Sequence, residues 1–196
     1  IDVKYMTAKE EDILTSSNLI QQGVVVDRLL ESVIANSEVK LNDMLVGDKN
    51  ALMIGTRILG YGKEYWTNIT DPDTKEKVEH CVDLTTLKHK EVDSKLMENG
   101  NKFEFELPNS KRVIEFKLLT HKDEKEIEEE LKALKKFTKL SGVTNEVTTR
   151  LKKAITAVDG DSSIKRINEF VDYELLSRDS FELRDYLRKI TPDVDM

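Results

Sequence analysis

The sequence has little of the material on which many catalytic, metal-binding or secreted domains depend. Its 196 residues include one cysteine, one tryptophan and three histidines, and aromatic residues make up only 6%. The single cysteine, Cys81, excludes a disulfide within the chain and suits a protein of a reducing cytoplasm. Internal repeats and low-complexity linkers are also absent, and the length fits one domain or one core with a small appendage.

Long apolar runs are missing as well. The longest, residues 23–26 and 51–55, are short and flanked by polar residues, whereas a transmembrane helix needs about 20 mostly apolar residues. We therefore expect no membrane span. The chain begins at Ile1 without an initiator methionine or a signal-peptide pattern, so we interpret it as the ordered portion of a longer protein.

An excess of positive charge is the third absence. The 31 basic and 38 acidic residues give a formal net charge of -7, whereas nucleic-acid-binding domains usually carry a basic excess or a basic face. A lysine cluster within residues 132–139 is offset by the acidic run 124–130, so we expect no nucleic-acid partner. What the chain does contain is 38% hydrophobic and 35% charged residues, enough for a core beneath a heavily charged surface.

The first third of the chain has the periodicity of helices. Thr7 and Glu10 have the spacing of a capping box, which predicts a helix over residues 8–15. Residues 24–35 place apolar side chains at helical spacing, and a nearly apolar helix is predicted from residues 47–50 through Leu59. Together these segments predict an N-terminal helical unit over residues 1–62. The Gly-Tyr-Gly that closes it fits a helix end and a turn better than a phosphate loop, which needs a third glycine after a strand.

In the middle of the chain the period changes to two. Residues 65–69 alternate, residues 71–74 have the composition of a turn, and residues 78–84 predict the returning strand. A second hairpin is predicted over residues 102–118. The two hairpins together predict a small, mostly antiparallel sheet in the region 63–119.

Residues 120–196 are predicted to form a C-terminal helical bundle. One helix covers residues 145–158, another begins at Ser162 or Ser163, and the last is capped by Asp179. The whole pattern predicts an α+β fold with an N-terminal helical unit, a small antiparallel sheet of two hairpins and a C-terminal helical bundle, forming one compact protein.

Two of the C-terminal helices carry our candidates for partner binding. A long charged helix begins at Thr120 or His121 and has a narrow apolar stripe that extends to Phe137. Such a stripe fits the groove of a partner, although packing within its own domain would explain the same spacing. The only tryptophan, Trp66, we interpret as a core residue rather than an interface anchor. The partner-binding candidates are Ile127, Leu131, Leu134, Phe181, Tyr186 and Leu187.

No constellation of residues points to catalysis or to a metal. His80 and Cys81 are neighbours in a predicted strand, so their side chains point to opposite faces and cannot form a catalytic pair. Neither they nor His89 and His121 have further ligands at metal-binding spacing. Residues 159–162 lack the full calcium-loop pattern and fit a turn between helices. We therefore predict a protein that is not an enzyme and holds no metal and no cofactor.

Five segments form a long and specific pattern: residues 5–16 (YMTAKEEDILTS), 18–23, 26–32 (VDRLLES), 45–51 (LVGDKNA) and 57–62 (RILGYG). This pattern resembles that of the baseplate hub family of T4-like contractile-tailed phages. The likeness is strong over about the first third of the chain, looser in the hairpin region and weakest in the helical C-terminal half.

The resemblance implies a protein without known chemistry that is needed to build the central hub of the baseplate. Its partners would be other baseplate hub and tail proteins, in a hetero- or homo-oligomer. The resemblance leaves open whether the chain is a hub component of the virion tail baseplate or an assembly chaperone of the host cytoplasm. Some relatives have paired cysteines after Gly62, where this chain has only Cys81 nearby, so we expect no zinc in its hairpin.

One alternative from a different class stays open, a small nucleic-acid or regulatory binding module. Its binding would be lost on raising the salt concentration, whereas apolar contacts with hub proteins would be far less sensitive to salt.

Overall fold

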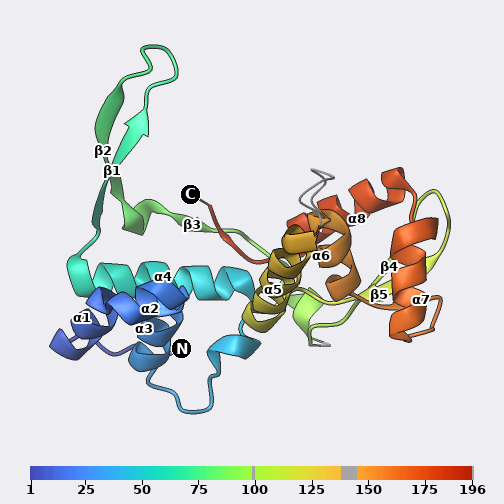
Figure 1. The fold of residues 1–196 in the computed structure, drawn as a ribbon, viewed down its shortest axis with the longest axis horizontal. Helices are drawn as coiled ribbons and strands as arrows, with labels where there is room; N and C mark the ends of the chain where they lie inside the picture. The colour runs from blue at the N-terminus through green and yellow to red at the C-terminus, as the bar shows by residue number, and fades with distance from the viewer. Residues whose placement is uncertain (99, 138–144, 196) are drawn as a thin grey trace. The chain divides into compact units, whose positions relative to one another are not determined.

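The structure is a computed structural model that describes residues 1–98, 100–137 and 145–195. Helices and antiparallel strands are both well represented in it, which confirms the predicted α+β class. Figure 1 shows the helices and strands along the chain.

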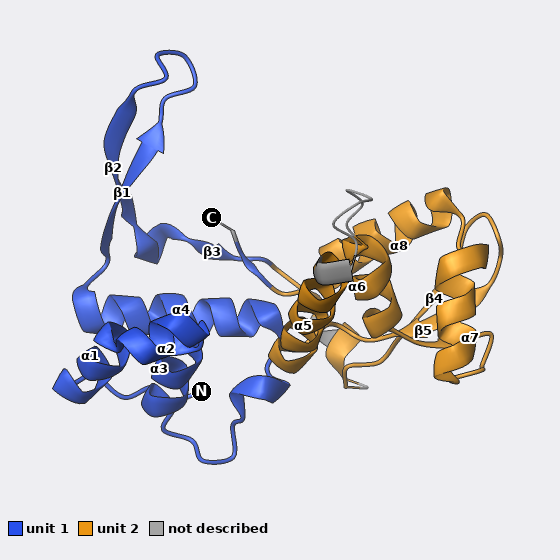
Figure 2. Ribbon diagram, in the orientation of Figure 1, with its two compact units in different colours: residues 1–90, 193–196 blue, residues 91–192 orange. Residues whose placement is uncertain are grey.

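The chain divides into two compact units (Figure 2). Unit 1 comprises Ile1–Lys90 with Asp193–Met196, and unit 2 comprises Glu91–Pro192. The division after Lys90 falls inside the region 63–119 that the sequence suggested as one sheet, so the two predicted hairpins belong to different units. The prediction that they share a sheet is therefore wrong.

Unit 1 begins with four α-helices, joined by short turns and one 3-10 turn at Leu41–Asp43. The predicted capping box is present, because the Glu10 carboxylate accepts hydrogen bonds from Thr7 N at 2.8 Å and from Thr7 Oγ1 at 2.6 Å. The last of the four helices ends at Gly62, whose φ of 83° suits glycine, as the helix-end interpretation predicted. Their bounds are α1 Ala8–Thr15, α2 Ser17–Gln22, α3 Val25–Val33 and α4 Val46–Tyr61.

The core of unit 1 lies between α3, the 3-10 turn and α4. Beside it, Lys49 Nζ donates to Asp27 Oδ1 at 2.8 Å and ties α4 to α3 through an ion pair that is largely buried. The nearly apolar helix predicted through Leu59 is only partly buried, because Met53 and Leu59 of α4 are 42% and 40% exposed. One cluster of this core consists of the buried residues Leu30, Leu41, Met44 and Leu52.

A hairpin of β1 (Glu64–Thr70) and β2 (Lys77–Asp83) follows α4, in an antiparallel register that pairs Glu64 with Asp83. Asp71 Oδ1 caps the turn by accepting from Asp73 N at 2.8 Å and Thr74 N at 2.9 Å. The hairpin is a two-stranded sheet by itself. After it, β3 (Lys88–His89) pairs with β7 (Val194–Asp195) near the end of the chain.

The structure corrects the interpretation of Trp66. Its side chain is 58% exposed, and no described third strand or helix pairs with the hairpin to form the core that the alternation suggested. Period-two alternation indicates a strand but does not say what covers either face.

Unit 2 combines a three-stranded antiparallel sheet, in the order β4-β5-β6, with helices before, between and after its strands. Stacked rings fill part of its core, with the centroids of Phe103 and Phe116 5.4 Å apart. Its main elements are β4 Phe103–Glu106, β5 Val113–Phe116, α5 His121–Phe137, α6 Glu146–Ala154, β6 Ile155–Val158, α7 Ile164–Glu169, a π-helical turn Phe170–Glu174 and α8 Ser177–Ile190.

The helix predicted over residues 145–158 is wrong in its last turn. α6 ends at Ala154, and Ile155–Val158 instead forms β6 against β5. Ile155 and Val158 are both buried there, and as β-branched residues they fit a strand better than a helix. Apolar spacing alone does not distinguish a helix from a strand here. The strand forms because it pairs with a segment far away in the sequence, as the pairing of Ala157 with Glu115 shows.

Asp179 is not the cap of the last helix. α8 begins two residues earlier, at Ser177, and Asp179 lies in its first turn. There its carboxylate accepts hydrogen bonds from Asn109 and Ser110 in the turn between β4 and β5. Asp179 thus accepts backbone N–H groups as a cap would, but these groups belong to the β4–β5 turn and not to α8.

Candidate protein-binding surfaces

The three described stripe residues of α5 differ in how much surface they present. Ile127 is completely buried within unit 2, while Leu131 and Leu134 are half-buried. The side chain of Phe137 lies outside the described residues. Ile127 therefore holds α5 in its own unit, and a partner contact stays a prediction for Leu131 and Leu134.

The α8 candidates divide in the same way. Tyr186 stacks on Phe105 with a centroid distance of 4.8 Å and meets Phe116 edge-on at 6.1 Å, so its ring covers the β4–β5 pair. Leu187 is half-buried. Phe181 is 59% exposed, which leaves it as the candidate of this helix with the largest free surface.

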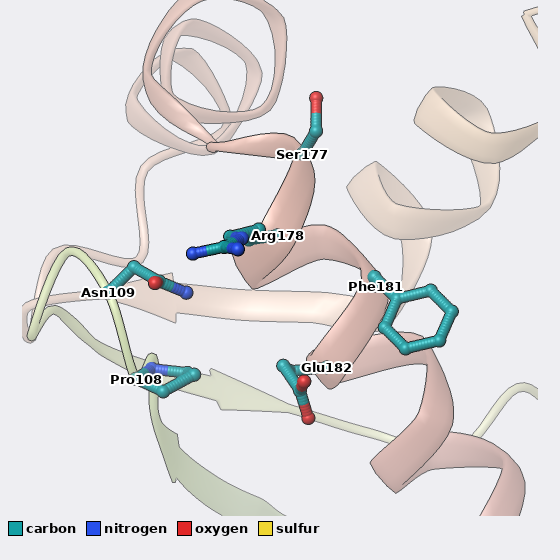
Figure 3. Close-up of a pocket in the computed structure, with 6 residues that line it drawn as sticks. All are labelled: Pro108, Asn109, Ser177, Arg178, Phe181 and Glu182. Atoms are coloured by element: carbon teal, nitrogen blue, oxygen red, sulfur yellow. The ribbon is translucent and has the colours of Figure 1, made fainter.

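Phe181 borders a pocket of about 680 Å³ at the start of α8. Figure 3 shows Pro108 and Asn109 on the turn after β4, facing the first turns of α8. Arg178 and Glu182 are both exposed and place opposite charges one helical turn apart on its wall. The lining therefore combines one exposed apolar ring with charged and polar groups. The lining residues are Pro108, Asn109, Ser177, Arg178, Phe181 and Glu182.

Asp179 holds one wall of this pocket in place, through its hydrogen bonds with the turn that contains Asn109. Oδ1 accepts from Asn109 N at 2.9 Å and from Asn109 Nδ2 at 2.8 Å, and Oδ2 accepts from Ser110 N at 3.0 Å. Burial alone would raise the pKa of Asp179, but these hydrogen bonds outweigh it and hold the pKa below its usual range. The carboxylate is therefore charged and pins the β4–β5 turn to α8.

A second, more apolar groove of about 480 Å³ lies in unit 1, between α4 and the base of the hairpin. The Arg57 guanidinium lies over the rings of Tyr61 and Tyr65, at 5.0 and 6.0 Å from their centroids. The same group donates to Gly62 O at 3.2 Å and Glu64 O at 3.4 Å, so the cation is held against the chain. The groove is lined by Met53, Ile54, Arg57, Tyr65, Thr67, Val82, Leu84 and Leu87.

The apolar surface continues from this groove along one face of the hairpin. The register pairs Tyr65 with Val82 and Ile69 with Val78 on that face. Tyr65, Ile69 and Val78 are each 45–47% exposed. The apolar alternation predicted both strands, but it does not show that this face stays exposed.

The opposite face of the hairpin carries Trp66 beside Cys81, its directly paired residue. His80 lies on the other face, opposite Thr67, so the two possible metal ligands of β2 point apart. Within the part of the chain that the structure describes, no group of three or more histidine, cysteine, aspartate or glutamate side chains could hold a metal ion. No helix among the described residues is long and apolar enough to cross a membrane.

The chain matches the model of a known protein family. A family model described as T4 bacteriophage base plate protein matches residues 1–183 of the chain. No curated protein and no solved structure matches it. The matched range includes every residue that lines the two pockets, of which Glu182 is the last in the sequence.

Proposed function

Since the chain belongs to the family of T4 bacteriophage base plate proteins, we propose that it is required for assembly of the central hub of the baseplate. It acts there through contacts with other hub and tail proteins, as a hub component of the virion or as an assembly chaperone in the host cytoplasm. The family match over residues 1–183 is the observation that carries this proposal. The predicted baseplate membership is thereby confirmed, and the hub role is the finer step that we add.

The surfaces of the two units support a role in binding proteins. Exposed apolar side chains gather on the hairpin and beside the α8 pocket, where burial against a partner would remove apolar area from water. Neither pocket is lined by a histidine, a cysteine or a pair of carboxylates. Histidine, cysteine and paired carboxylates are common catalytic groups. Ser177 lines the α8 pocket, but no histidine in that lining is present to activate it, so the pockets favour binding over chemistry.

The proposal is tested in a phage whose gene for this chain carries a stop codon, with the chain supplied from a plasmid. Without the plasmid we expect no plaques and no tails with a complete baseplate hub, as seen by electron microscopy. Plaques and complete baseplates without the plasmid would overturn the proposal.

Mass spectrometry of the same preparations distinguishes the two forms of the role. A hub component is present in purified virions as well as in assembly intermediates, whereas a chaperone is present in the intermediates alone.

A further inference from the structure

The two open edges of the β1–β2 hairpin differ in chemistry. From Tyr65 to Thr70, β1 contains no charged residue and no proline, whereas β2 carries Lys77, Glu79 and Asp83. Natural proteins protect exposed strand edges with charges, lysine above all, or with proline, because an unprotected edge pairs with other strands. The edge of β2 has that protection and the edge of β1 does not.

The hydrogen bonds of the hairpin show which backbone groups of β1 point outward. Leu84 N donates to Lys63 O and Asp71 N donates to Glu76 O, each at 2.9 Å. In an antiparallel pair every second residue bonds to the partner strand, so residues 65, 67 and 69 bond to β2. The residues between them turn their N–H and C=O groups away from β2.

Four residues of β1 therefore face outward: Glu64, Trp66, Asn68 and Thr70. Arg57 Nη2 already donates to Glu64 O at 3.4 Å, which is consistent with that direction. Within the described residues β1 pairs with β2 alone. Trp66, Asn68 and Thr70 thus present a row of backbone donors and acceptors spaced to match another strand.

The apolar face of the hairpin indicates the side chains such a strand would carry. A two-stranded hairpin is only marginally stable in water, whereas three strands with an apolar face are stable. A strand added beside β1 would place every second side chain next to Tyr65 and Ile69, on the face that continues into the α4 groove. Those side chains would be apolar, and their burial would cover part of the exposed surface.

We propose that β1 receives a β-strand from another baseplate protein, which adds to the hairpin edge as a third strand. The origin of that strand rests on the proposed function. Unit 1 contains 11 basic and 17 acidic residues, whereas unit 2 contains 20 and 21. Nearly all of the net negative charge of the chain lies in unit 1, so a second copy would be repelled and a strand from a basic partner would be attracted.

Asn68→Pro tests the strand addition. Proline removes an outward N–H of β1 and disturbs a third strand, while the bonds between β1 and β2 are kept because Asn68 N–H does not take part in them. The matched control is Glu79→Pro, since Glu79 is directly paired with Asn68 and faces outward from the β2 edge. Circular dichroism and the emission of Trp66 verify that both variants keep the hairpin.

Both variants are supplied from the plasmid to the phage that lacks the gene. We expect Asn68→Pro to reduce plaque number at least a hundredfold and Glu79→Pro to complement as well as the wild type. Full complementation by Asn68→Pro, or equal loss in both folded variants, would overturn the proposal. If the phage forms plaques without any plasmid, the proposed function fails. That result is distinct from a failure of the strand-addition proposal, which appears only in the comparison of the two variants.

Amide hydrogen exchange of the wild-type chain gives an answer even where a proline variant does not fold. The chain carries an affinity tag, and the probe is the hub intermediate isolated through it from infected cells. We expect the amides of Trp66, Asn68 and Thr70 to exchange at least tenfold more slowly in the intermediate than in the free chain, and those of Glu79 and Cys81 to change little. Unchanged exchange along β1 would contradict strand addition.

The oligomeric state of the purified chain tests which protein supplies the added strand. Light scattering after size-exclusion chromatography should give a monomer at all concentrations. A dimer that Asn68→Pro disrupts would show that the strand comes from a second copy and would overturn the assignment to another protein.

Discussion

Asp179 shows how a single buried carboxylate can connect two distant parts of unit 2. It is fully buried, and three N–H groups of Asn109 and Ser110 converge on it across about 70 positions of sequence. Asp179→Ala leaves these groups without their acceptor, and we expect the free energy of unfolding to fall by about 2–3 kcal/mol. Urea unfolding followed by circular dichroism measures this change in the free energy of unfolding. Asp185→Ala, which removes only surface ion pairs of the same helix, is the control and should change little.

Glu10 connects α1 to α3 and makes the stability of unit 1 depend on pH. Hydrogen bonds from Ser32 and from Thr7 lower its pKa from 4.5 to about 2. The folded pKa lies below the unfolded one, so the charged carboxylate stabilises the fold in full above pH 4.5, and this contribution is lost as the pH falls through 2.

We therefore expect Glu10→Gln to lower the free energy of unfolding at pH 6 and to have a progressively smaller effect toward pH 2. Urea unfolding at a series of pH values measures the difference between the two proteins. The exposed neighbour Glu11→Gln controls for the general loss of charge. A difference between Glu10→Gln and the wild type that does not vary with pH would show that the hydrogen bonds of Glu10 do not depend on its ionisation.

Helix α5 illustrates why spacing alone does not identify an interface. Ile127 is fully buried, and Leu131 and Leu134, one and two turns further on, are half-buried. Truncation of Ile127 leaves a cavity, so Ile127→Ala should cost about 2–4 kcal/mol in the free energy of unfolding.

Leu131→Asp should leave the isolated chain folded and abolish its complex with the proposed hub partner. Loss of the fold in Leu131→Asp, seen by circular dichroism, would place Leu131 in the core of unit 2 as well.

At the scale of elements, local signals located most helices and both hairpins. The capping box at Thr7 and the turn at Asp71 depend on residues a few positions apart, and both form as predicted. β6 was missed because its strand conformation depends on pairing with β5. Trp66 was placed in a core because a strand pattern does not show which layers cover it.

At the scale of the molecule, the distribution of charge favours protein partners over nucleic acid. The formal net charge is -7, and no excess of basic residues falls in either unit. The proposed complex of the chain with hub proteins should therefore survive a rise in NaCl from about 50 to 200 mM, whereas a binder with 6–10 phosphate contacts would lose roughly 10³–10⁵ in affinity. Pull-down of the tagged chain at both concentrations measures this. Loss of binding at the higher salt would favour the nucleic-acid or regulatory module.

The sequence by itself determined the α+β class, the absence of a long apolar run, and the pattern of the first third that resembles baseplate proteins. These depend on composition and on short-range periodicity, which a single chain displays directly. The tertiary structure decided the division after Lys90, the separation of the two hairpins, the strand at Ile155–Val158 and the exposure of Trp66. Each of these depends on which distant segment pairs with or covers an element, and the local pattern of residues is the same whether or not that cover exists.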